Sequence, residues 1–409
     1  MSDERPAEPE TDAVGASAPS RTRAGRRALV VCSLEPWTEV RRRLRIVIDE
    51  LVAADPDLDV LYVAPPVDVL HVLRTAPGRL PRAWRTLRLE AVHPRVHVLR
   101  PRKWAPRRLG TLAQRSLERQ VLGAAAHLGL VDPVLWVNDA LYAPLVTRTG
   151  WPSVYDITDD WLLSDLPPRQ RQRLESAERT LLEQADAVVV CSPELARTRG
   201  ATRPVELIGN GVDVDLFQRP QPRPDDLAAA PVAVYVGTLQ DERVDVELVV
   251  QMATERPDMQ YVLIGPNSLS GPADARLRAL PNVDLHGPVP YERVPAYLQH
   301  ADVVIVPHRV GAFTESLDPI KAYECLAVGR PTVATPVAGF RDLPPPVRTA
   351  EPAQFAGAVS AALAEGTPPG TSVPSPRAVP TWHDRARMVG DVLDRVRAGV
   401  QPPEEGGRA

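Results

Sequence analysis

The stretch SLDPIKAYECLAVGRPTVAT, residues 316–335, decides how the fold of this chain is interpreted. It follows the apolar run ADVVIVPH at 301–308, which is typical of a buried strand in a parallel sheet. Asp318 and Pro319 then form a helix-start signal, with Asp318 expected as the N-cap and Pro319 as the first helical residue. The stretch therefore predicts a helix that begins at the carboxyl end of a strand, where α/β sheets bind ligands.

Two charged residues lie in the first turns of this predicted helix. Lys321 adds a full positive charge to a helix N-terminus, an arrangement that binds anions such as a diphosphate. Glu324, three residues later on the same face, can accept hydrogen bonds from two vicinal sugar hydroxyls. Spacing alone favours the alternative, in which Lys321 and Glu324 form an exposed ion pair that stabilises the helix by roughly a few tenths of a kcal/mol. The position at a strand end, beside the loop HRVGAFTES at 308–316, favours a nucleoside diphosphate site.

Length and composition indicate a two-domain globular protein. The chain has 409 residues, of which 44% are hydrophobic and 24% charged, with a net charge of -4. This overall charge predicts no nucleic-acid partner. The cysteines Cys32, Cys191 and Cys325 show no paired spacing, which argues against a disulfide framework or a metal knuckle. This use of cysteine makes a reducing cytoplasm the expected setting. The sequence contains no apolar stretch long enough to span a membrane, so no membrane-spanning segment is expected.

Short β-branched runs alternate with helical patterns along the chain, which predicts parallel sheets with helices on both faces. The alternation begins with ALVVCS at 28–33, pauses in a Pro-rich polar stretch at 218–231 and restarts with PVAVYVGTL at 231–239. We expect an N-terminal domain at 26–217, a linker at 218–230, a C-terminal domain at 231–380, a helix at 381–400 and disordered tails at 1–25 and 401–409.

Four segments resemble those of GT-B fold glycosyltransferases, in particular a family 4 branch similar to teichuronic-acid-type enzymes, and they follow one another along the chain in the order of that family. Residues 316–335 resemble the nucleotide-binding motif DPxKxYEYLAxGxPVV, and VYVGTLQDERVDVELV at 234–249 resembles the first strand and loop of the nucleotide domain. IGNGVDVDLF at 208–217 resembles the domain crossover, and ERTLLEQADAVVVCSPELA at 178–196 the end of the acceptor domain. The resemblance implies an α/β GT-B fold: two Rossmann-like doubly wound domains facing a central cleft, with a C-terminal helix that crosses back to the first domain.

The resemblance also implies roles for individual residues. Glu324 matches a ribose-binding Glu, and Lys321 matches a Lys that contacts the diphosphate. The first Glu of the E-x7-E motif falls at Ser316, which leaves recognition of the donor sugar open, with Glu315 and Asp318 as substitutes. Arg243 matches a cation that neutralises the leaving diphosphate, and a solvated Arg is its alternative. The predicted donor site comprises Gly237, Arg243, Gly287, Val289, Ser316, Asp318, Lys321 and Glu324, with the backbone of Gly287 and Val289 at the nucleobase.

Polar residues that follow strands of the first domain are candidates for the acceptor side. Asp159 and Asp160, in YDITDDW at 155–161, have three possible roles: to position an acceptor hydroxyl, to act as a base, or to cap the next helix. With Arg243 and Lys321 they form the predicted catalytic set. Four further residues are predicted on the acceptor side: Trp37, Arg43, Asn138 and Asp139. Simple exposure to solvent is the alternative for Arg43.

The region 74–119 of the first domain is rich in Arg and carries Trp84 and Trp104. Such a patch suits an anionic membrane surface or a lipid-phosphate acceptor, and it predicts peripheral contact with the inner face of the cell membrane. A solvated Arg-rich face is the alternative.

Together these features predict a glycosyltransferase that moves a sugar from a nucleoside-diphosphate sugar to an acceptor hydroxyl, in cell-envelope polysaccharide, glycolipid or natural-product glycosylation. The donor is a substrate, and neither a metal nor another cofactor is expected. The family 4 resemblance implies retention of anomeric configuration, whereas an Asp base would invert it. A nucleotide-sugar epimerase of related fold and a non-catalytic GT-B-like partner protein are the alternatives, and Ser316 favours the partner.

Overall fold

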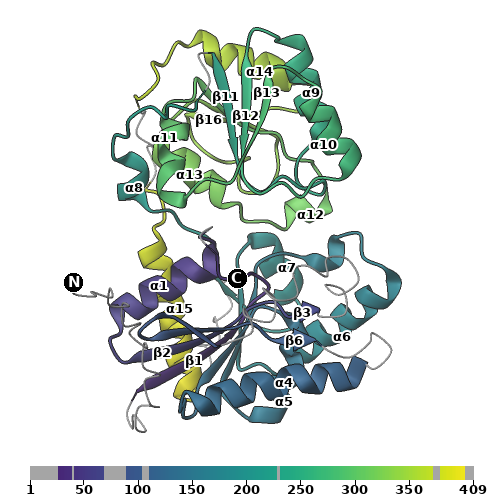
Figure 1. The fold of residues 1–409 in the computed structure, drawn as a ribbon, viewed down its shortest axis with the longest axis vertical. Helices are drawn as coiled ribbons and strands as arrows, with labels where there is room; N and C mark the ends of the chain where they lie inside the picture. Colours follow the sequence, from purple (N-terminus) through teal and green to yellow (C-terminus); the bar gives the residue numbers. More distant parts are fainter. Residues whose placement is uncertain are drawn as a thin grey trace, which may run out of the picture.

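The computed structural model describes residues 26–38, 41–68, 89–103, 110–227, 231–371 and 378–400. They form two α/β domains arranged along the longest axis of the molecule (Figure 1). The predictions for the tails at 1–25 and 401–409 lie outside the described residues, as does the predicted basic region at 74–88 and 104–109. Within the described ranges, no helix is both long and apolar enough to cross a membrane.

One sheet of eight strands forms the centre of the N-terminal domain. Its strands are β1 (Arg27–Cys32), β2 (Leu58–Val63), β4 (Glu90–His93), β5 (Val96–Leu99), β7 (Val134–Val137), β8 (Ser153–Ile157), β9 (Ala187–Val190) and β10 (Glu206–Leu207). Their spatial order is β10-β9-β8-β7-β1-β2-β5-β4, and all neighbours are parallel except β4, which runs antiparallel to β5. The short strands β3 (Val67–Asp68) and β6 (Arg102–Lys103) pair separately. The order reverses direction between β1 and β7, which is where such sheets form a ligand crevice.

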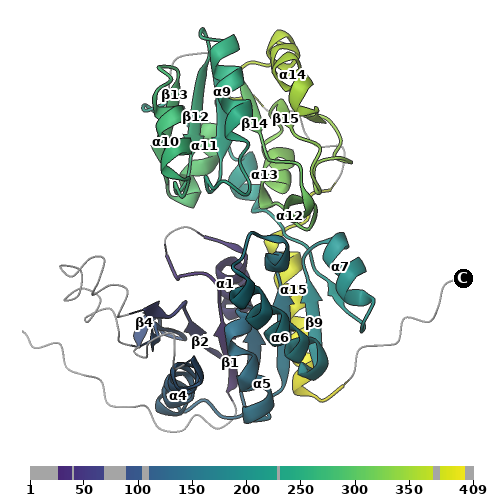
Figure 2. The ribbon, with the colours of Figure 1, turned by 90° about the vertical axis from the view of Figure 1, so that its right-hand side faces the viewer.

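Side chains of the N-terminal sheet alternate between two faces, as the pleat of a strand requires. Leu29 and Val31 pack on the face covered by α1 (Arg43–Ala54) and α15 (Trp382–Arg397). Val30 and Cys32 pack on the opposite face. That face is covered by α4 (Gly110–His127), α5 (Ala143–Thr149), α6 (Pro168–Gln184) and α7 (Pro193–Gly200). The predicted return of the C-terminal helix to the first domain is confirmed, since α15, yellow in Figure 2, packs against α1.

Six parallel strands form the sheet of the C-terminal domain. They are β11 (Val232–Val236), β12 (Gln260–Ile264), β13 (Val283–Gly287), β14 (Val303–Val306), β15 (Thr332–Ala334) and β16 (Val347–Thr349). Their spatial order β13-β12-β11-β14-β15-β16 is the doubly wound order of a dinucleotide-binding domain, and it reverses between β11 and β14. The helices of this domain are α8 (Val214–Gln218), α9 (Val246–Glu255), α10 (Gly271–Arg278), α11 (Val294–Gln299), α12 (Ala312–Glu315), α13 (Ile320–Val328) and α14 (Pro352–Ala364).

The chain crosses between the domains earlier than the sequence predicts. Ile208 packs in the N-terminal core, whereas Val212 and Phe217 are already buried in the C-terminal core. The predicted linker at 218–230 is therefore misplaced, because Leu227 within it also packs in the C-terminal core. Polar and Pro-rich composition marks a surface loop there, while the crossover itself is only a few residues long.

At the crossover the outgoing chain passes directly against the returning chain. The backbone N–H of Val212 donates to Pro380 at 3.0 Å, and the N–H of Trp382 donates to Val212 at 3.3 Å. A Cβ placed on Gly211 would lie 2.7 Å from the carbonyl carbon of Thr381, a distance that side chains essentially never adopt. Glycine is therefore required at 211 by the close approach of two backbones.

We expect Gly211→Ala to destabilise the protein, by about 1–3 kcal/mol, because the added methyl forces the two crossing segments apart. Thermal unfolding followed by circular dichroism measures the effect. Gly357→Ala is the matched control, since its Cβ meets no atom within 4 Å and it lies inside α14. An unchanged melting temperature for Gly211→Ala would contradict the rigid crossover.

Candidate functional site

A cavity of about 400 Å³ lies between the two domains and is lined by residues from both. The N-terminal domain contributes Leu34 and Glu35 after β1, Asn138 after β7, and Asp159 after β8. The C-terminal domain contributes the segments that follow β11, β12, β13 and β14 and the start of α13. The cavity thus joins the points at which the two strand orders reverse, which is where open α/β sheets bind ligands.

Lys321 extends from the first turn of α13 across the backbone of Gly237, which follows β11. A Cβ on Gly237 would lie 2.1 Å from Cε and 2.4 Å from Nζ of Lys321. The ammonium also lies 5.5 Å from the ring centre of Tyr235. A side chain at position 237 would displace the end of this lysine, so two residues predicted from separate motifs meet at one place in the cavity.

Burial lowers the pKa of Lys321 and raises the pKa of Glu324, so the two values lie close together. The Glu324 side chain lines the same cavity and the residue is 7% exposed, which rules out an exposed surface pair. Burial raises the pKa of Glu324 to about 7, opposed by the charge of Lys321. Burial, reinforced by Arg243, lowers the pKa of Lys321 to about 8, opposed by Glu324. Perturbed groups of this kind concentrate at functional sites.

Asp318 does not cap α13 as the sequence predicts. The helix begins at Ile320, and Pro319 occupies the N-cap position without a side-chain hydrogen bond. The Asp318 carboxylate instead accepts hydrogen bonds from the Tyr323 hydroxyl at 2.7 Å and from the backbone N–H of Asn210 in the crossover. Asp318 lines the cavity, yet its carboxylate is used to attach α13 to the crossover.

Arg43 is also bound to the crossover. It is buried and donates to the carbonyls of Ile208 at 2.7 Å and Gly209 at 2.8 Å, and to Oδ1 of Asn210 at 3.1 Å. The solvent-exposed alternative is therefore wrong. Arg43 also lines the cavity on the side of the N-terminal domain, so its predicted contact with an acceptor stays a prediction, while most of its hydrogen bonds attach it to the crossover.

Ser316, the position of the missing Glu, faces away from the cavity. Its hydroxyl donates to the carbonyl of Phe313 at 2.7 Å, and its own carbonyl accepts from the hydroxyl of Ser192 in the N-terminal domain at 2.6 Å. The suggested substitute Glu315 pairs with Arg341. The prediction that Ser316 contacts the donor is therefore not supported, since this residue connects the domains.

The neighbours Asp159 and Asp160 point in different directions. Asp160 is buried and binds Arg199 through two hydrogen bonds of 2.5 and 2.9 Å, and Arg199 also pairs with Glu178 at 2.9 Å. This ion cluster is structural, so the predicted catalytic role of Asp160 is not supported. Asp159 lines the cavity and reaches Arg243 of the other domain at 3.0 Å. Burial raises the pKa of Asp159, opposed first by Arg243.

An aromatic contact accompanies this ion pair across the cleft. Trp161, two residues after Asp159, packs against Phe313 with ring centres 5.7 Å apart. The guanidinium of Arg243 lies 5.8 Å from the same Phe313 ring. Arg243 lines the cavity, and its buried Nε has no hydrogen-bond partner within the part of the chain that the structure describes, so the solvated-Arg alternative does not hold.

The remaining predicted residues divide between the cavity and the scaffold. Asn138 lines the cavity, accepting from the N–H of Leu34 and donating to Thr158, both at 3.2 Å. Asp139 caps the short helix η3 (Ala140–Tyr142), and burial raises its pKa to about 6. Trp37 packs edge-on against Tyr62 at 4.9 Å, away from the lining. Val289 lines the cavity, while the carbonyl of Gly287 accepts from Gly265 at 2.9 Å.

Several residues that line the cavity were missed by sequence reasoning, among them Glu35, Arg42, Tyr291 and His308. Burial raises the pKa of Glu35, opposed first by Arg42. Burial, with Lys321 and Arg243, lowers the pKa of His308 well below its usual value, and its Nδ1 has no hydrogen-bond partner among the residues described. Glu35 lies just after β1 and His308 just after β14, and each of these strands borders the point at which the strand order of its sheet reverses. A position just after such a strand was the signal in the sequence that could have identified both residues.

Part of the predicted basic region is described, and two of its arginines, Arg95 and Arg100, have partners within the protein. Arg95 donates to the carbonyls of Val52, at 2.6 Å, and of Asp55. Arg100 pairs with Glu90. These contacts favour the alternative of a structural, solvated face for the described part of the region.

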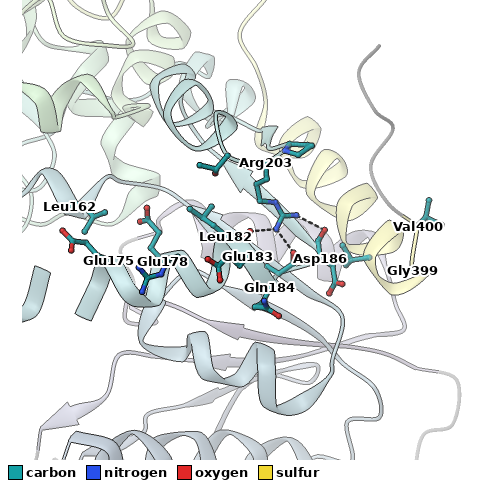
Figure 3. Close-up of a pocket in the computed structure, with 15 residues that line it drawn as sticks. Leu162, Glu175, Glu178, Leu182, Glu183, Gln184, Asp186, Arg203, Gly399 and Val400 are labelled. Atoms are coloured by element: carbon teal, nitrogen blue, oxygen red, sulfur yellow. Dashed lines mark hydrogen bonds between the residues drawn. The ribbon is translucent and has the colours of Figure 1, made fainter. Parts of the chain in front are cut away.

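A second hollow, of about 950 Å³, lies on the N-terminal domain beside α6 and the end of α15 (Figure 3). Figure 3 shows Arg203 directed at the end of α6, where it donates to the carbonyls of Leu182 and Ala185, each at 2.8 Å. Glu178 at its edge belongs to the ion cluster of Arg199. The hollow is larger than the interdomain cavity, but it lies away from the carboxyl ends of the strands and from the shifted pair Lys321 and Glu324.

Residues 230–365 match the family model described as Glycosyl transferases group 1. A Bacillus subtilis (strain 168) protein, provisionally named teichuronic acid biosynthesis glycosyltransferase TuaH, is 28% identical over 222 residues. The matched region covers 49% of this chain and 55% of that protein, and so spans about half the length of the relative.

Solved structures resemble the chain over nearly its whole length. Anabaena Alr3699/HepE, in complex with UDP and glucose, superposes with a TM-score of 0.57 at 15% identity, covering 91% of this chain and 97% of that one. The α,α-trehalose-phosphate synthase (UDP-forming) of Burkholderia vietnamiensis gives 0.55 at 13% identity, covering 91% and 97%. The chain therefore has the two-domain GT-B fold of these structures, and its residues 230–365 match the glycosyl transferases group 1 model.

Proposed function

We propose that this protein transfers a sugar from a nucleoside-diphosphate sugar to an acceptor hydroxyl. The observation that carries the proposal is the placement of Lys321 over Gly237 at the start of α13, with Glu324 about one turn deeper in the same cavity. The ammonium and the free N–H groups of the helix start suit a diphosphate. The carboxylate, set back from the helix start, suits the hydroxyls of a ribose rather than a second anion.

Departure of the nucleoside diphosphate leaves negative charge that the site must stabilise. Lys321 and Arg243 line the same cavity, and both are drawn from the C-terminal domain. Preorganised cations in a partly buried site stabilise a leaving group strongly, because little solvent reorganisation is needed. We infer from this arrangement that the reaction proceeds without a bound metal.

The acceptor is placed on the N-terminal side of the cavity, near Asp159, Glu35 and Asn138. Asp159 is bound to Arg243 at 3.0 Å, an arrangement that disfavours a free general base and supports retention over inversion. The name of the Bacillus relative supports cell-envelope polysaccharide as the setting, with glycolipid and natural-product acceptors as alternatives and peripheral membrane contact as part of the proposal.

The two rival functions fit the geometry less well. An epimerase needs no acceptor side, whereas this cavity is lined from both domains. A serine at position 316, in place of the first Glu of the E-x7-E motif, is the feature that favours the second rival, a non-catalytic partner protein. Ser316 serves an interdomain contact with Ser192, so its presence is explained without loss of the donor site.

We expect Lys321→Ala to lower kcat/KM for transfer by about 10²-fold or more, through loss of stabilisation of the leaving group. Glu324→Ala should weaken nucleotide binding with a smaller effect on kcat. Release of nucleoside diphosphate in the presence of acceptor, together with isothermal titration calorimetry, measures both effects. Lys103→Ala is the matched control, because Lys103 and Lys321 are the two lysines of the chain.

Three outcomes of that assay would contradict the proposal. Nucleotide binding that is unchanged in both Lys321→Ala and Glu324→Ala would contradict the placement of the donor site at these residues. A change in sugar stereochemistry without acceptor would indicate the epimerase, and absence of turnover with every donor and acceptor pair would indicate the partner protein.

The pH dependence of donor binding follows from the two shifted groups. Diphosphate binds the protonated Lys321, so affinity is retained below its pKa of about 8 and falls as the pH rises above it. Hydrogen bonds to ribose favour the ionised Glu324, so affinity also falls as the pH drops below about 7. The affinity for a nucleoside-diphosphate sugar, measured by titration at a series of pH values, should therefore be greatest at a pH between these two pKa values.

Two variants check this assignment. Lys321→Arg should extend binding to higher pH, because a guanidinium stays charged there. Glu324→Gln should remove the acid limb. A flat profile for the unmodified protein, or limbs that persist unchanged in both variants, would argue against the assignment.

A further inference from the structure

Two apolar side chains of the N-terminal domain line the interdomain cavity and remain exposed. Trp161 is 36% exposed and Leu34 is 39% exposed. They follow different strands, β8 and β1, and Asn138 joins the two segments by accepting from Leu34 and donating to Thr158. A single exposed apolar side chain is common, but two in one cavity indicate a surface that a ligand covers.

The backbone beneath Trp161 is held firmly in place. Trp161 begins the short helix η4 (Trp161–Leu163), with Asp160 at the N-cap position. The two hydrogen bonds from Arg199 to the Asp160 carboxylate fix this start from within the N-terminal domain. The N–H of Leu163 donates to the carbonyl of Asp160 at 3.0 Å and closes the turn. The indole is thus presented to the cavity by a preorganised segment, as a binding group requires.

The contact between Trp161 and Phe313 leaves part of the indole open. The two rings are tilted by 51° with their centres 5.7 Å apart, so they do not stack face to face. Phe313 belongs to α12 of the other domain and is itself buried. Trp161 therefore contacts the opposite domain and still has surface left for a ligand.

The charges around this surface are balanced. Each arginine of the cavity lining has a carboxylate partner: Arg41 with Asp49 at 2.8 Å, Arg42 with Glu35 at 3.7 Å, Arg43 with Asp156 at 3.8 Å and Arg243 with Asp159 at 3.0 Å. Recognition of a phosphate calls for cations that are available to pair with it. The N-terminal side of the cavity therefore suits a neutral acceptor better than a lipid phosphate.

A neutral sugar ring has the chemistry that this surface fits. The C–H groups on one face of a pyranose are apolar and pack against an aromatic ring, while the hydroxyls at its rim donate to carboxylates. Trp161 supplies the aromatic face, and Asp159 and Glu35 supply carboxylate oxygens in the same cavity. A purely aliphatic ligand would cover these carboxylates without donating to them, which costs free energy.

We propose that Trp161 and Leu34 form the acceptor subsite, and that the acceptor hydroxyl belongs to a neutral sugar ring that stacks on the Trp161 indole. This inference rests on the proposed function, because it assumes that the N-terminal side of the cavity takes the acceptor. The group that is glycosylated is then a sugar, and a lipid phosphate is not itself the acceptor.

The test measures the binding of simple pyranosides by saturation-transfer difference NMR. UDP, GDP, ADP, CDP and dTDP are first titrated by isothermal titration calorimetry, and the tightest binder is then kept at saturation. The probes are the methyl pyranosides of glucose, galactose, mannose and N-acetylglucosamine, with octyl phosphate as the anionic probe. At least one pyranoside should bind more tightly than octyl phosphate, with the strongest saturation at its ring C–H protons.

Substitution of Trp161 tests the stacking contact. Trp161→Ala should weaken binding of that pyranoside about three- to tenfold, because one aromatic contact is lost. Trp161→Phe should lose less, since it keeps an aromatic face. Leu163→Ala is the matched control, because Leu163 is exposed on the same helix and does not line the cavity. A thermal melt and a nucleoside diphosphate titration of each variant verify that the fold and the donor site are intact.

A further variant separates stacking from contact between the domains. Phe313→Leu removes the aromatic partner of Trp161 across the cleft and keeps the indole itself. It should weaken pyranoside binding less than Trp161→Ala does. Equal losses in the two variants would show that Trp161 acts through the interdomain contact, and would overturn the stacking role.

The outcomes separate the inference from the function beneath it. Three results in a protein that binds a nucleoside diphosphate would overturn the acceptor subsite alone: no pyranoside binding, tighter binding of octyl phosphate, or pyranoside binding that is unchanged in Trp161→Ala. Failure of the unmodified protein to bind any of the nucleoside diphosphates would overturn the proposed donor site and this inference with it.

Discussion

Hydrogen bonds to Asn210, a residue of the crossover, hold the two domains in the arrangement that creates the cavity. Arg43 of α1 donates to its side chain at 3.1 Å, Arg385 of α15 donates to its carbonyl at 3.0 Å, and its backbone N–H donates to Asp318. One crossover residue is thus bound by the first domain, the returning helix and the segment that leads into α13. Because buried hydrogen bonds to charged groups are strong when fully paired, the start of α13 and the N-terminal domain are positioned together.

Positioning α13 in this way fixes the chemistry of the cavity. Lys321 lies over Gly237, where its charge is partly desolvated, and Glu324 is buried in the same wall. Desolvation raises the free energy of both charged forms, so a ligand that supplies opposite charge to the lysine and hydroxyls to the carboxylate is favoured. The ion pair of Asp159 with Arg243 then closes the opposite side of the cleft, so the cavity is bounded by contacts between the domains.

Much of this was predictable, and the failures share one physical cause. Periodicity and strand-end position identified two doubly wound domains and placed Lys321, Glu324 and Gly237 at a ligand site, because these signals are local. Arg243 was assigned through the resemblance to GT-B glycosyltransferases, and the structure brings all four residues to one cavity. Sequence reasoning misassigned Asp318, Ser316 and Asp160, and missed that Arg43 binds the crossover, because polar groups of all four residues pair with residues distant in the chain. A carboxylate before a proline has the sequence of a helix cap, and only the fold shows that Asn210 occupies it. Tyr291 was missed because burial of a lone polar group leaves no periodic signal, whereas His308 was missed although its position just after β14 was a usable one.

The most direct measurement of the donor site is amine labelling of the chain's two lysines, with and without bound nucleoside diphosphate. Mass spectrometry after brief acetylation near pH 8, roughly the pKa of Lys321, reports the modified fraction of Lys321 and Lys103 separately. Saturating nucleoside diphosphate should protect Lys321 and leave Lys103 unchanged, because the diphosphate covers the ammonium over Gly237. Equal labelling of Lys321 with and without a nucleotide that is shown to bind would contradict the donor site at α13.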